Sequence, residues 1–277
     1  MNRFRIVADS ACDLLALDGA DFVGIPLTIR TDTVEFRDDA SLDVDAMVQT
    51  LLNTKSRSYS ACPGVADWED AFGESGDVIA FTITSGLSGS YNSAQSARNN
   101  CLEHDPSRRI HVVDSLSAGP EIALLIEKAR ACANAGMDAD EAFRAVEAYK
   151  ERTHLLFSLE SMHNLAQNGR VSKLVATMAG VLGIRAIGQA SAEGKLEMLG
   201  KCRGAAKARA FLLNEMERFG YKGGSVRIGH CQNETAATEL SAAIRDRFPG
   251  ADVKFYPSRG LCSYYAERGG IMMGFES

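Results

Sequence analysis

The chain has 277 residues, a formal net charge of -6 at pH 7 and a sequence pI near 5.5. This acidic balance, without a run of clustered Lys or Arg, argues against nonspecific nucleic-acid binding, which depends on neutralising phosphates. With 45% hydrophobic and 24% charged residues, the composition is that of a globular protein, and the length favours two medium-sized domains over a single core.

The N-terminal segment and the cysteines predict a cytoplasmic protein. Residues 1–14 pass from a charged start directly into a strand-like stretch, without the apolar core of a signal peptide. No run of about 18 apolar residues predicts a membrane span. The seven cysteines form no C-x-x-C pair, which favours reduced thiols, and the five histidines lack metal-ligand spacing. We therefore expect no metal site.

In the first half of the chain, short apolar runs that end in small polar residues alternate with amphipathic helical stretches. The apolar runs are 5–14, 22–30, 77–90 and 110–120, and the helical stretches are 44–55, 91–104 and 121–136. This alternation predicts an α/β domain with a parallel sheet covered by helices.

Polar residues follow three of these predicted strands. They are Asp9-Ser10, Thr84-Ser85-Gly86 and Asp114-Ser115. In parallel sheets, ligands bind outside the carboxyl ends of the strands, so we expect hydroxyls and carboxylates to meet at one edge. For Asp9, the simpler expectation is that its side chain caps the helix that follows.

The pattern changes near residue 150, and we place a domain boundary near residue 154. A strand ends at about 159, a helix is predicted over 160–183, and residues 184–204 are typical of an antiparallel hairpin with an Ala-Glu-Gly turn. Alternating helices and strands follow to the C-terminus. The predicted domains are 1–153 and 154–277.

The stretch "FTITSGLSGSYNSAQSA" (81–97) joins a strand to a helix through Ser, Thr and Gly. One interpretation is helix capping and a tight turn. The other is an anion site, because a helix start lined by hydroxyls offers donors to phosphate or carboxylate. The stretch lacks the lysine of a phosphate-binding loop and the order G-x-G-x-x-G, and the chain has no G-x-S-x-G, so neither nucleotide binding nor an α/β-hydrolase nucleophile is indicated.

Two further segments are candidates. Ser60-Ala61-Cys62-Pro63 is predicted to be a loop, because proline fixes φ and removes a donor. Asn168-Gly169-Arg170 combines a glycine suited to a left-handed turn with a guanidinium that can bind a carboxylate or phosphate. The alternative for Arg170 is an ordinary surface arginine.

Taken in chain order, these motifs resemble the DegV family of bacterial fatty-acid-binding proteins across essentially the whole chain. The motifs are "IVADSACDL", "SACPG", "TSGLSGSYNSA", "VVDSLSAGPEIALL", "NLAQNGRVSK", "LGKCRGAAKA" and "RGGIMMGF". The resemblance implies a larger α/β domain with a parallel sheet, a smaller α/β domain with a mixed or antiparallel sheet, and a fatty acid in a tunnel between them.

The resemblance also implies a set of binding residues. Ser60 and Ser88 match the hydroxyl residues that hold the fatty-acid carboxylate, with Gly89 offering a backbone N–H beside Ser88. Arg170 matches the arginine of the family's G-R-[IV]-[ST] motif, and Arg203 matches a second family arginine after the hairpin. Tyr265 stands where relatives that serve a fatty acid kinase carry histidine.

The resulting hypothesis is a carrier without catalytic residues or cofactor. It binds a long-chain fatty acid such as palmitate and presents the carboxylate to a partner, with a fatty acid kinase catalytic subunit as the candidate. Two alternatives stay open: a phosphotransferase or hydrolase that uses the same serine-rich edge, and a regulatory protein whose lipid is only structural. A general base beside Ser88 would favour the enzyme.

Overall fold

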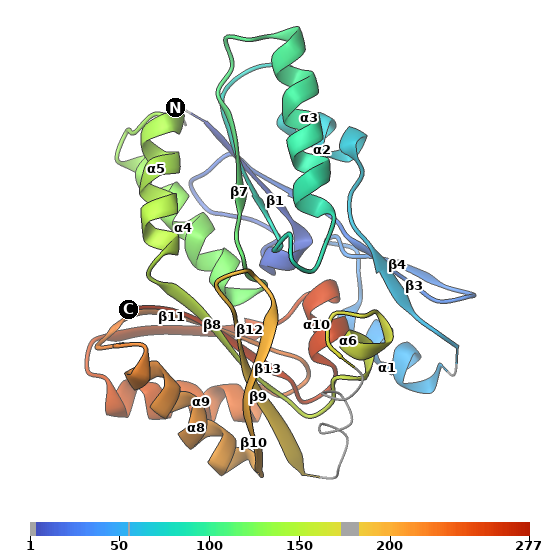
Figure 1. Ribbon diagram of the computed structural model, residues 1–277, viewed down its shortest axis with the longest axis vertical. Coiled ribbons are helices and arrows are strands. Elements are labelled where there is room, and N and C mark those ends of the chain that lie inside the picture. Colours follow the sequence, from blue (N-terminus) through green and yellow to red (C-terminus); the bar gives the residue numbers. More distant parts are fainter. Residues whose placement is uncertain (1–3, 55, 173–182) are drawn as a thin grey trace.

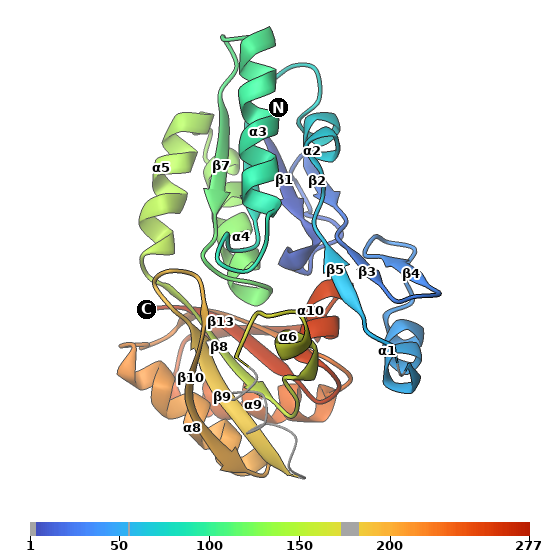
Figure 2. The ribbon, with the colours of Figure 1, turned by 45° about the vertical axis from the view of Figure 1, so that its right-hand side comes forward.

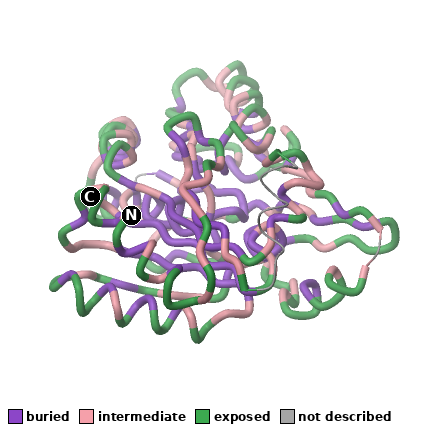
Figure 3. The backbone as a smooth tube through the Cα atoms, turned by 60° about the horizontal axis from the view of Figure 1, so that its bottom comes forward, coloured by how far each residue is buried: buried purple, intermediate pink, exposed green. Residues whose placement is uncertain are grey.

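The computed structural model describes residues 4–54, 56–172 and 183–277. Its strands form three sheets, and helices lie against them (Figure 1). Buried residues concentrate in the middle of the molecule, and exposed residues are frequent at its periphery (Figure 3). Within these residues no helix is long and apolar enough to cross a membrane.

The first sheet is the parallel sheet that the sequence predicts. Its strand order is β2 (Phe22–Ile25), β1 (Arg5–Asp9), β6 (Val78–Thr82) and β7 (Ile110–Asp114), and every pairing is parallel. Helices α2 (Val65–Phe72) and α3 (Ser90–His104) cover one face, and α4 (Pro120–Asn134) and α5 (Ala139–Lys150) cover the other (Figure 2). Because both faces are covered, all five residues of β6 are buried.

A second, smaller sheet corrects two predictions. Residues 22–30 are not one strand: the chain leaves the first sheet after β2, and beyond Pro26 it forms β3 (Thr28–Arg30), which pairs with β4 (Glu35–Arg37) and β5 (Tyr59–Ala61) in antiparallel fashion. Proline has no N–H to continue the first ladder, so the strand divides there. Ser60 and Ala61 were predicted to lie in a loop but belong to β5, which leads on to α2. Helix α1 (Val44–Asn53) connects β4 to β5.

The third sheet is mixed and holds the strands from β8 onward, in the order β10-β9-β8-β13-β11-β12. The strands are β8 (Thr153–Leu159), β9 (Ile184–Ala190), β10 (Leu196–Arg203), β11 (Gly224–His230), β12 (Ala251–Pro257) and β13 (Ile271–Glu276). Only β11 and β12 pair in parallel. The predicted hairpin is confirmed, since β9 and β10 pair in antiparallel fashion. Helices α8 (Ala205–Arg218) and α9 (Glu234–Arg247) contribute to the apolar core on one side of this sheet.

The long helix predicted over 160–183 is wrong in its first part. Helix α6 spans only His163–Gln167, and Gly169 adopts φ +74°, a left-handed conformation that ends the helix. Residues 173–182 of the predicted helix lie outside the described residues.

Helix α4 packs between the two larger sheets, and helix α10 (Gly260–Ala266) links the third sheet to the second, smaller one. The start of α4 lies against β13 so closely that a Cβ at Gly274 would come within 2.5 Å of the backbone nitrogen of Glu121. Helix α10 precedes β13 and lies beside β3 and α1 (Figures 1 and 2). Helices α4 and α10 therefore place the three sheets around a common centre.

Candidate functional site

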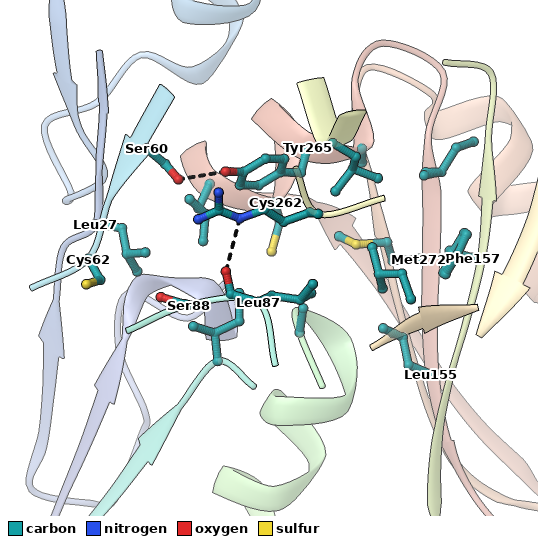
Figure 4. Close-up of a pocket in the computed structure, with 18 of the residues that line it drawn as sticks. Leu27, Ser60, Cys62, Leu87, Ser88, Leu155, Phe157, Cys262, Tyr265 and Met272 are labelled. Atoms are coloured by element: carbon teal, nitrogen blue, oxygen red, sulfur yellow. Dashed lines mark hydrogen bonds between the residues drawn. The ribbon is translucent and has the colours of Figure 1, made fainter. Parts of the chain in front are cut away.

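A cavity of about 300 Å³ lies between the carboxyl edge of the first sheet and one face of the third. Its size falls at the lower end of the usual range for small-molecule sites. Its wall combines residues from β5, β8, β13, α10 and the loops after β6 and α6. Figure 4 shows Ser60, Cys62 and Ser88 on one side of this space and Leu155, Phe157 and Met272 on the opposite side.

The side away from the serines is apolar because of the strand pleat. Leu155, Phe157 and Leu159 alternate along β8, so all three project from the same face, and all three line the cavity. Met272 on β13 pairs directly with Phe157. Leu155, Phe157 and Leu159 are each at most 3% exposed, so this end of the cavity is shut off from solvent.

The opposite side carries hydroxyl groups from three separate parts of the chain. Ser60 on β5 and Tyr265 on α10 share a hydrogen bond, with 2.7 Å between Oγ and the phenolic oxygen (Figure 4). Ser88 and Gly89 lie just before α3 and also line the cavity. A Cβ at Gly89 would lie 3.5 Å from Cys62 Sγ, which brings the segment after Ser60 beside the segment of Ser88. Donors from these segments can therefore converge on one anion.

The loop that carries Ser88 is fixed by Asp9, and this corrects the prediction that Asp9 caps the following helix. Its side chain makes no cap hydrogen bond; instead Oδ2 accepts from the backbone N–H of Ile83 (3.0 Å) and from Ser90 Oγ (2.6 Å). Asp9 is fully buried, which raises its pKa to about 6, while these hydrogen bonds oppose the rise. The acid at the end of β1 thus organises the loop after β6.

The predicted convergence at the sheet edge is confirmed by two further contacts. Asp114 at the end of β7 accepts a hydrogen bond from the backbone N–H of Ser85 (3.0 Å). Thr84 Oγ1 donates to the carbonyl of Gly194 in the β9–β10 turn (2.9 Å). Gly194 has φ +69°, and a Cβ there would lie 2.0 Å from Thr84 Oγ1, so only glycine permits this approach. The β9–β10 turn of the third sheet therefore contacts and supports the serine-rich loop.

Helix α10, which carries Tyr265, is fixed by two buried acids. Asp38 accepts from the backbone N–H groups of Gly260 (2.7 Å) and Leu261 (2.8 Å), and Asp13 accepts from that of Arg259 (2.9 Å). Burial raises the pKa of Asp13 to about 7 and also raises that of Asp38. These contacts join the first half of the chain to the C-terminal segment and hold the Tyr265 hydroxyl against Ser60.

The two predicted arginines lie in different places. Arg170 follows α6 and lines the cavity, where its Nε donates to the carbonyl of Leu87 (3.0 Å) and its Nη1 to that of Asn168 (2.5 Å). Both acceptors are backbone carbonyls, and among the residues that the structure describes no carboxylate forms an ion pair with Arg170.

Arg203 ends β10, is exposed, and is outside the cavity lining. The turn that contacts Thr84 is at the other end of that hairpin, and the seven steps from Leu196 to Arg203 span roughly 23 Å. The role that the resemblance gives Arg203 stays a prediction.

The structure brings further residues to the candidate site that sequence reasoning did not single out. Apart from the motif residues, the cavity wall is made of ordinary apolar side chains, such as Leu155, Phe157 and Leu159. Their only signal in the sequence is the alternation in "THLLFSL", which predicts a strand but not what its face contacts. Asp13 belongs to the motif "IVADSACDL", but nothing in the sequence indicates its contact or that of Asp38 with α10, because each partner lies more than 200 residues away.

The cavity lining contains Arg170 but, among the residues that the structure describes, no histidine, aspartate, glutamate or lysine. All seven cysteines are free. The site can therefore bind an anion at one end and bury an apolar group at the other. Among the described lining residues, none can serve Ser88 as a general base.

Comparison with known proteins gives a consistent result. A family model described as "Uncharacterised protein, DegV family" matches residues 3–275. A DegV domain-containing protein of Streptococcus pneumoniae is 46% identical over 277 residues, covering 99% of both chains. A crystal structure of a DegV family protein from Eubacterium eligens, loaded with heptadecanoic acid, is 47% identical with a TM-score of 0.97, covering 99% of both chains.

A second solved structure is that of the Streptococcus pneumoniae Fatty Acid Kinase (Fak) B3 protein loaded with linoleic acid. It is 45% identical to this chain with a TM-score of 0.96, and the match covers 99% of both chains. A more distant DegV family protein, from Ruminococcus gnavus and refined with vaccenic acid, is 27% identical with a TM-score of 0.90. The match covers 99% of this chain and 100% of that one.

Proposed function

This chain belongs to the DegV family, and from that membership we propose that it binds one long-chain fatty acid, such as palmitate, and presents the carboxylate to a protein partner. The observation that carries the proposal is the two-sided cavity, with hydroxyls from Ser60, Ser88 and Tyr265 on one side and the buried side chains of β8 on the other. The similar structures loaded with heptadecanoic and linoleic acids support it.

The expected binding energies of a fatty acid agree with a cavity that has one polar and one apolar side. Each buried methylene contributes about 0.8 kcal/mol, so a long acyl chain gains on the order of 10 kcal/mol before the costs of association. Hydrogen bonds to the carboxylate add less, but they decide which end of the lipid lies at Ser60 and Ser88. In this proposal residues 1–153 supply the carboxylate-binding loops and residues 154–277 cover the acyl chain.

We place the carboxylate between Ser60 and Ser88, with the backbone N–H of Gly89 and the charge of Arg170 nearby. Because the Tyr265 hydroxyl can either donate to Ser60 or accept from it, the Ser60 hydroxyl is free to donate to a carboxylate oxygen while accepting from Tyr265. Arg203 is proposed to act outside the cavity, in contact with the partner.

The proposed partner is the catalytic subunit of a fatty acid kinase, and the protein itself acts as a carrier in the cytoplasm rather than as an enzyme. The similarity to the Fak B3 protein supports this role. So does the composition of the lining, in which no described residue besides Arg170 carries a formal charge. A phosphotransferase or hydrolase would need a base beside Ser88.

Two experiments test the proposal. Mass spectrometry of lipid extracted from the purified protein is expected to find one long-chain fatty acid per chain, and a delipidated sample is expected to bind added palmitate. A purified fatty acid kinase subunit is then expected to form acyl phosphate from the loaded protein. A delipidated, folded protein that binds no fatty acid would contradict the carrier function, whereas binding without phosphorylation would contradict only the choice of partner.

A further inference from the structure

Four residues form one row across the third sheet. Met272 on β13 pairs with Phe157 on β8, Phe157 pairs with Gly188 on β9, and Gly188 pairs with Met198 on β10. Directly paired residues of antiparallel strands place their side chains on the same face, so the row faces the cavity that Met272 and Phe157 line. Gly188 is the one position of the row without a side chain.

The ring of Phe157 occupies the space that a side chain at Gly188 would need. A Cβ at Gly188 would lie 2.2 Å from Cζ and 2.5 Å from Cε2 of that ring. Both distances are far below van der Waals contact, so the ring lies over the backbone of β9. Phe157 is only 3% exposed and forms part of the end of the cavity away from the serines (Figure 4).

This placement sets how much of the cavity the ring leaves open. Phenylalanine side chains occupy a few staggered rotamers, and a ring expelled from β9 has to turn to another one. On the other side of Phe157 in the row is Met272, which itself lines the cavity. A ring displaced from Gly188 therefore moves into the space that the end of an acyl chain would fill.

We propose that Gly188 is a positioning residue that sets the length of acyl chain admitted by the cavity, because its missing side chain lets the Phe157 ring lie back over β9. The inference rests on the proposed fatty-acid binding and adds a determinant of chain length to it. It assigns selectivity to a glycine that makes no contact with the carboxylate end.

The direct test is Gly188→Ala, with affinities of delipidated protein measured for myristate (14 carbons) and stearate (18 carbons). One buried methylene corresponds to roughly a fourfold change in affinity, so shortening the cavity by two methylenes should lower the stearate-to-myristate affinity ratio on the order of 15-fold. The matched control is Gly200→Ala on β10, where a Cβ would meet the Phe211 ring at 3.1 Å and Phe211 is absent from the lining. That variant should leave the ratio unchanged.

A Cβ at Gly188 would also come within 2.4 Å of the Glu197 carbonyl, so this variant can lose its fold for an unrelated reason. Phe157→Leu tests the same pair from the other side: the smaller side chain should raise the stearate-to-myristate ratio several-fold. In a folded Gly188→Ala/Phe157→Leu double variant the ratio should return toward the wild-type value.

A folded Gly188→Ala protein with the wild-type ratio would overturn the inference, and so would an unchanged ratio in Phe157→Leu, whether or not the alanine variant folds. Wild-type protein that binds neither acid would instead overturn the proposed function itself.

Discussion

The two walls of the cavity are built by different means. The wall with the hydroxyls is assembled from loops and short elements, and long-range hydrogen bonds to Asp9 and Asp38 hold it in place. The wall of β8 and β13 needs no such support, because the strand pleat alone aligns Leu155, Phe157 and Met272. The wall with the hydroxyls can set the orientation of a bound lipid, and the wall of β8 and β13 can supply most of the binding affinity.

The largest effect is expected when a charge is placed on the wall of β8 and β13. Met272→Glu should lower palmitate affinity more than 100-fold, because an unpaired carboxylate there either keeps water in the cavity or has to be buried at high cost. Isothermal titration of the delipidated variant measures the loss.

The matched control for that variant is Leu52→Glu, which introduces the same charge at a surface leucine that is 53% exposed on α1. It should bind palmitate like the wild type. Comparable affinity of a folded Met272→Glu protein would show that the wall of β8 and β13 is not where the acyl chain lies.

On the opposite wall, removing one hydroxyl should have a smaller effect. Ser88→Ala and Ser60→Ala should each weaken palmitate binding by roughly 1.5–3 kcal/mol, the usual range for a hydrogen bond to a charged group. Ser96→Ala is the control, since that hydroxyl donates to the Asn92 carbonyl on the outer part of α3. If the double variant Ser60→Ala/Ser88→Ala retained full affinity, the carboxylate would have to lie elsewhere.

The contrast between the walls also explains what the sequence could predict. Ser60, Ser88 and Arg170 belong to compact motifs with glycine or proline, and the structure brings all three to one cavity. The parallel sheet and the β9–β10 hairpin were predictable from their hydrophobic periods. No period, in contrast, indicates that Phe157 lies over Gly188, because that contact depends on the pairing of two strands.

Three features of the fold were predicted wrongly or missed from the sequence, each for a physical reason. The chain divides at Pro26 although hydrophobic residues continue on both sides, and the break sends β3 to another sheet. No element was predicted over Val65–Phe72, where α2 is only eight residues long and gains its stability by burying Trp68. Asp9 has the sequence of a cap, but its carboxylate faces the loop after β6 and the start of α3, where Ile83 and Ser90 offer donors.

A finer test of the polar wall concerns the hydrogen bond between Tyr265 and Ser60. Tyr265→Phe removes one neutral hydrogen bond, so palmitate affinity should fall by about 1 kcal/mol, less than for either serine variant. Tyr265→His should keep affinity within the same margin while improving acyl-phosphate formation by a fatty acid kinase, if the imidazole of kinase-serving relatives has a role there. Robust phosphorylation of the wild type that is lost in Tyr265→Phe would show that tyrosine already serves the kinase.

The smallest effect on binding is expected where the two halves of the chain are joined, at Asp13. Its pKa is raised to about 7 by burial, whereas in the unfolded chain it returns to the ordinary value of 3.8. Between these values the folded state binds more protons than the unfolded state, so the contribution of Asp13 to the free energy of unfolding is complete below about pH 4 and falls as the pH rises toward 7. Asp13→Asn cannot titrate but still accepts from the Arg259 N–H. Urea unfolding at intervals from pH 4 to 8 should therefore show that the free energy of unfolding declines less steeply with pH for the variant than for the wild type. Palmitate affinity should stay within threefold of the wild type.

The control is Asp138→Asn on the surface. The hydrogen bond from the Glu141 N–H lowers the pKa of Asp138, so the contribution of Asp138 to the free energy of unfolding is lost only as the pH falls below about 4. Identical slopes for the wild type and Asp13→Asn would show that the acid which fixes α10 is ionised in the folded protein, and that the two halves are joined by a charged group rather than a neutral one.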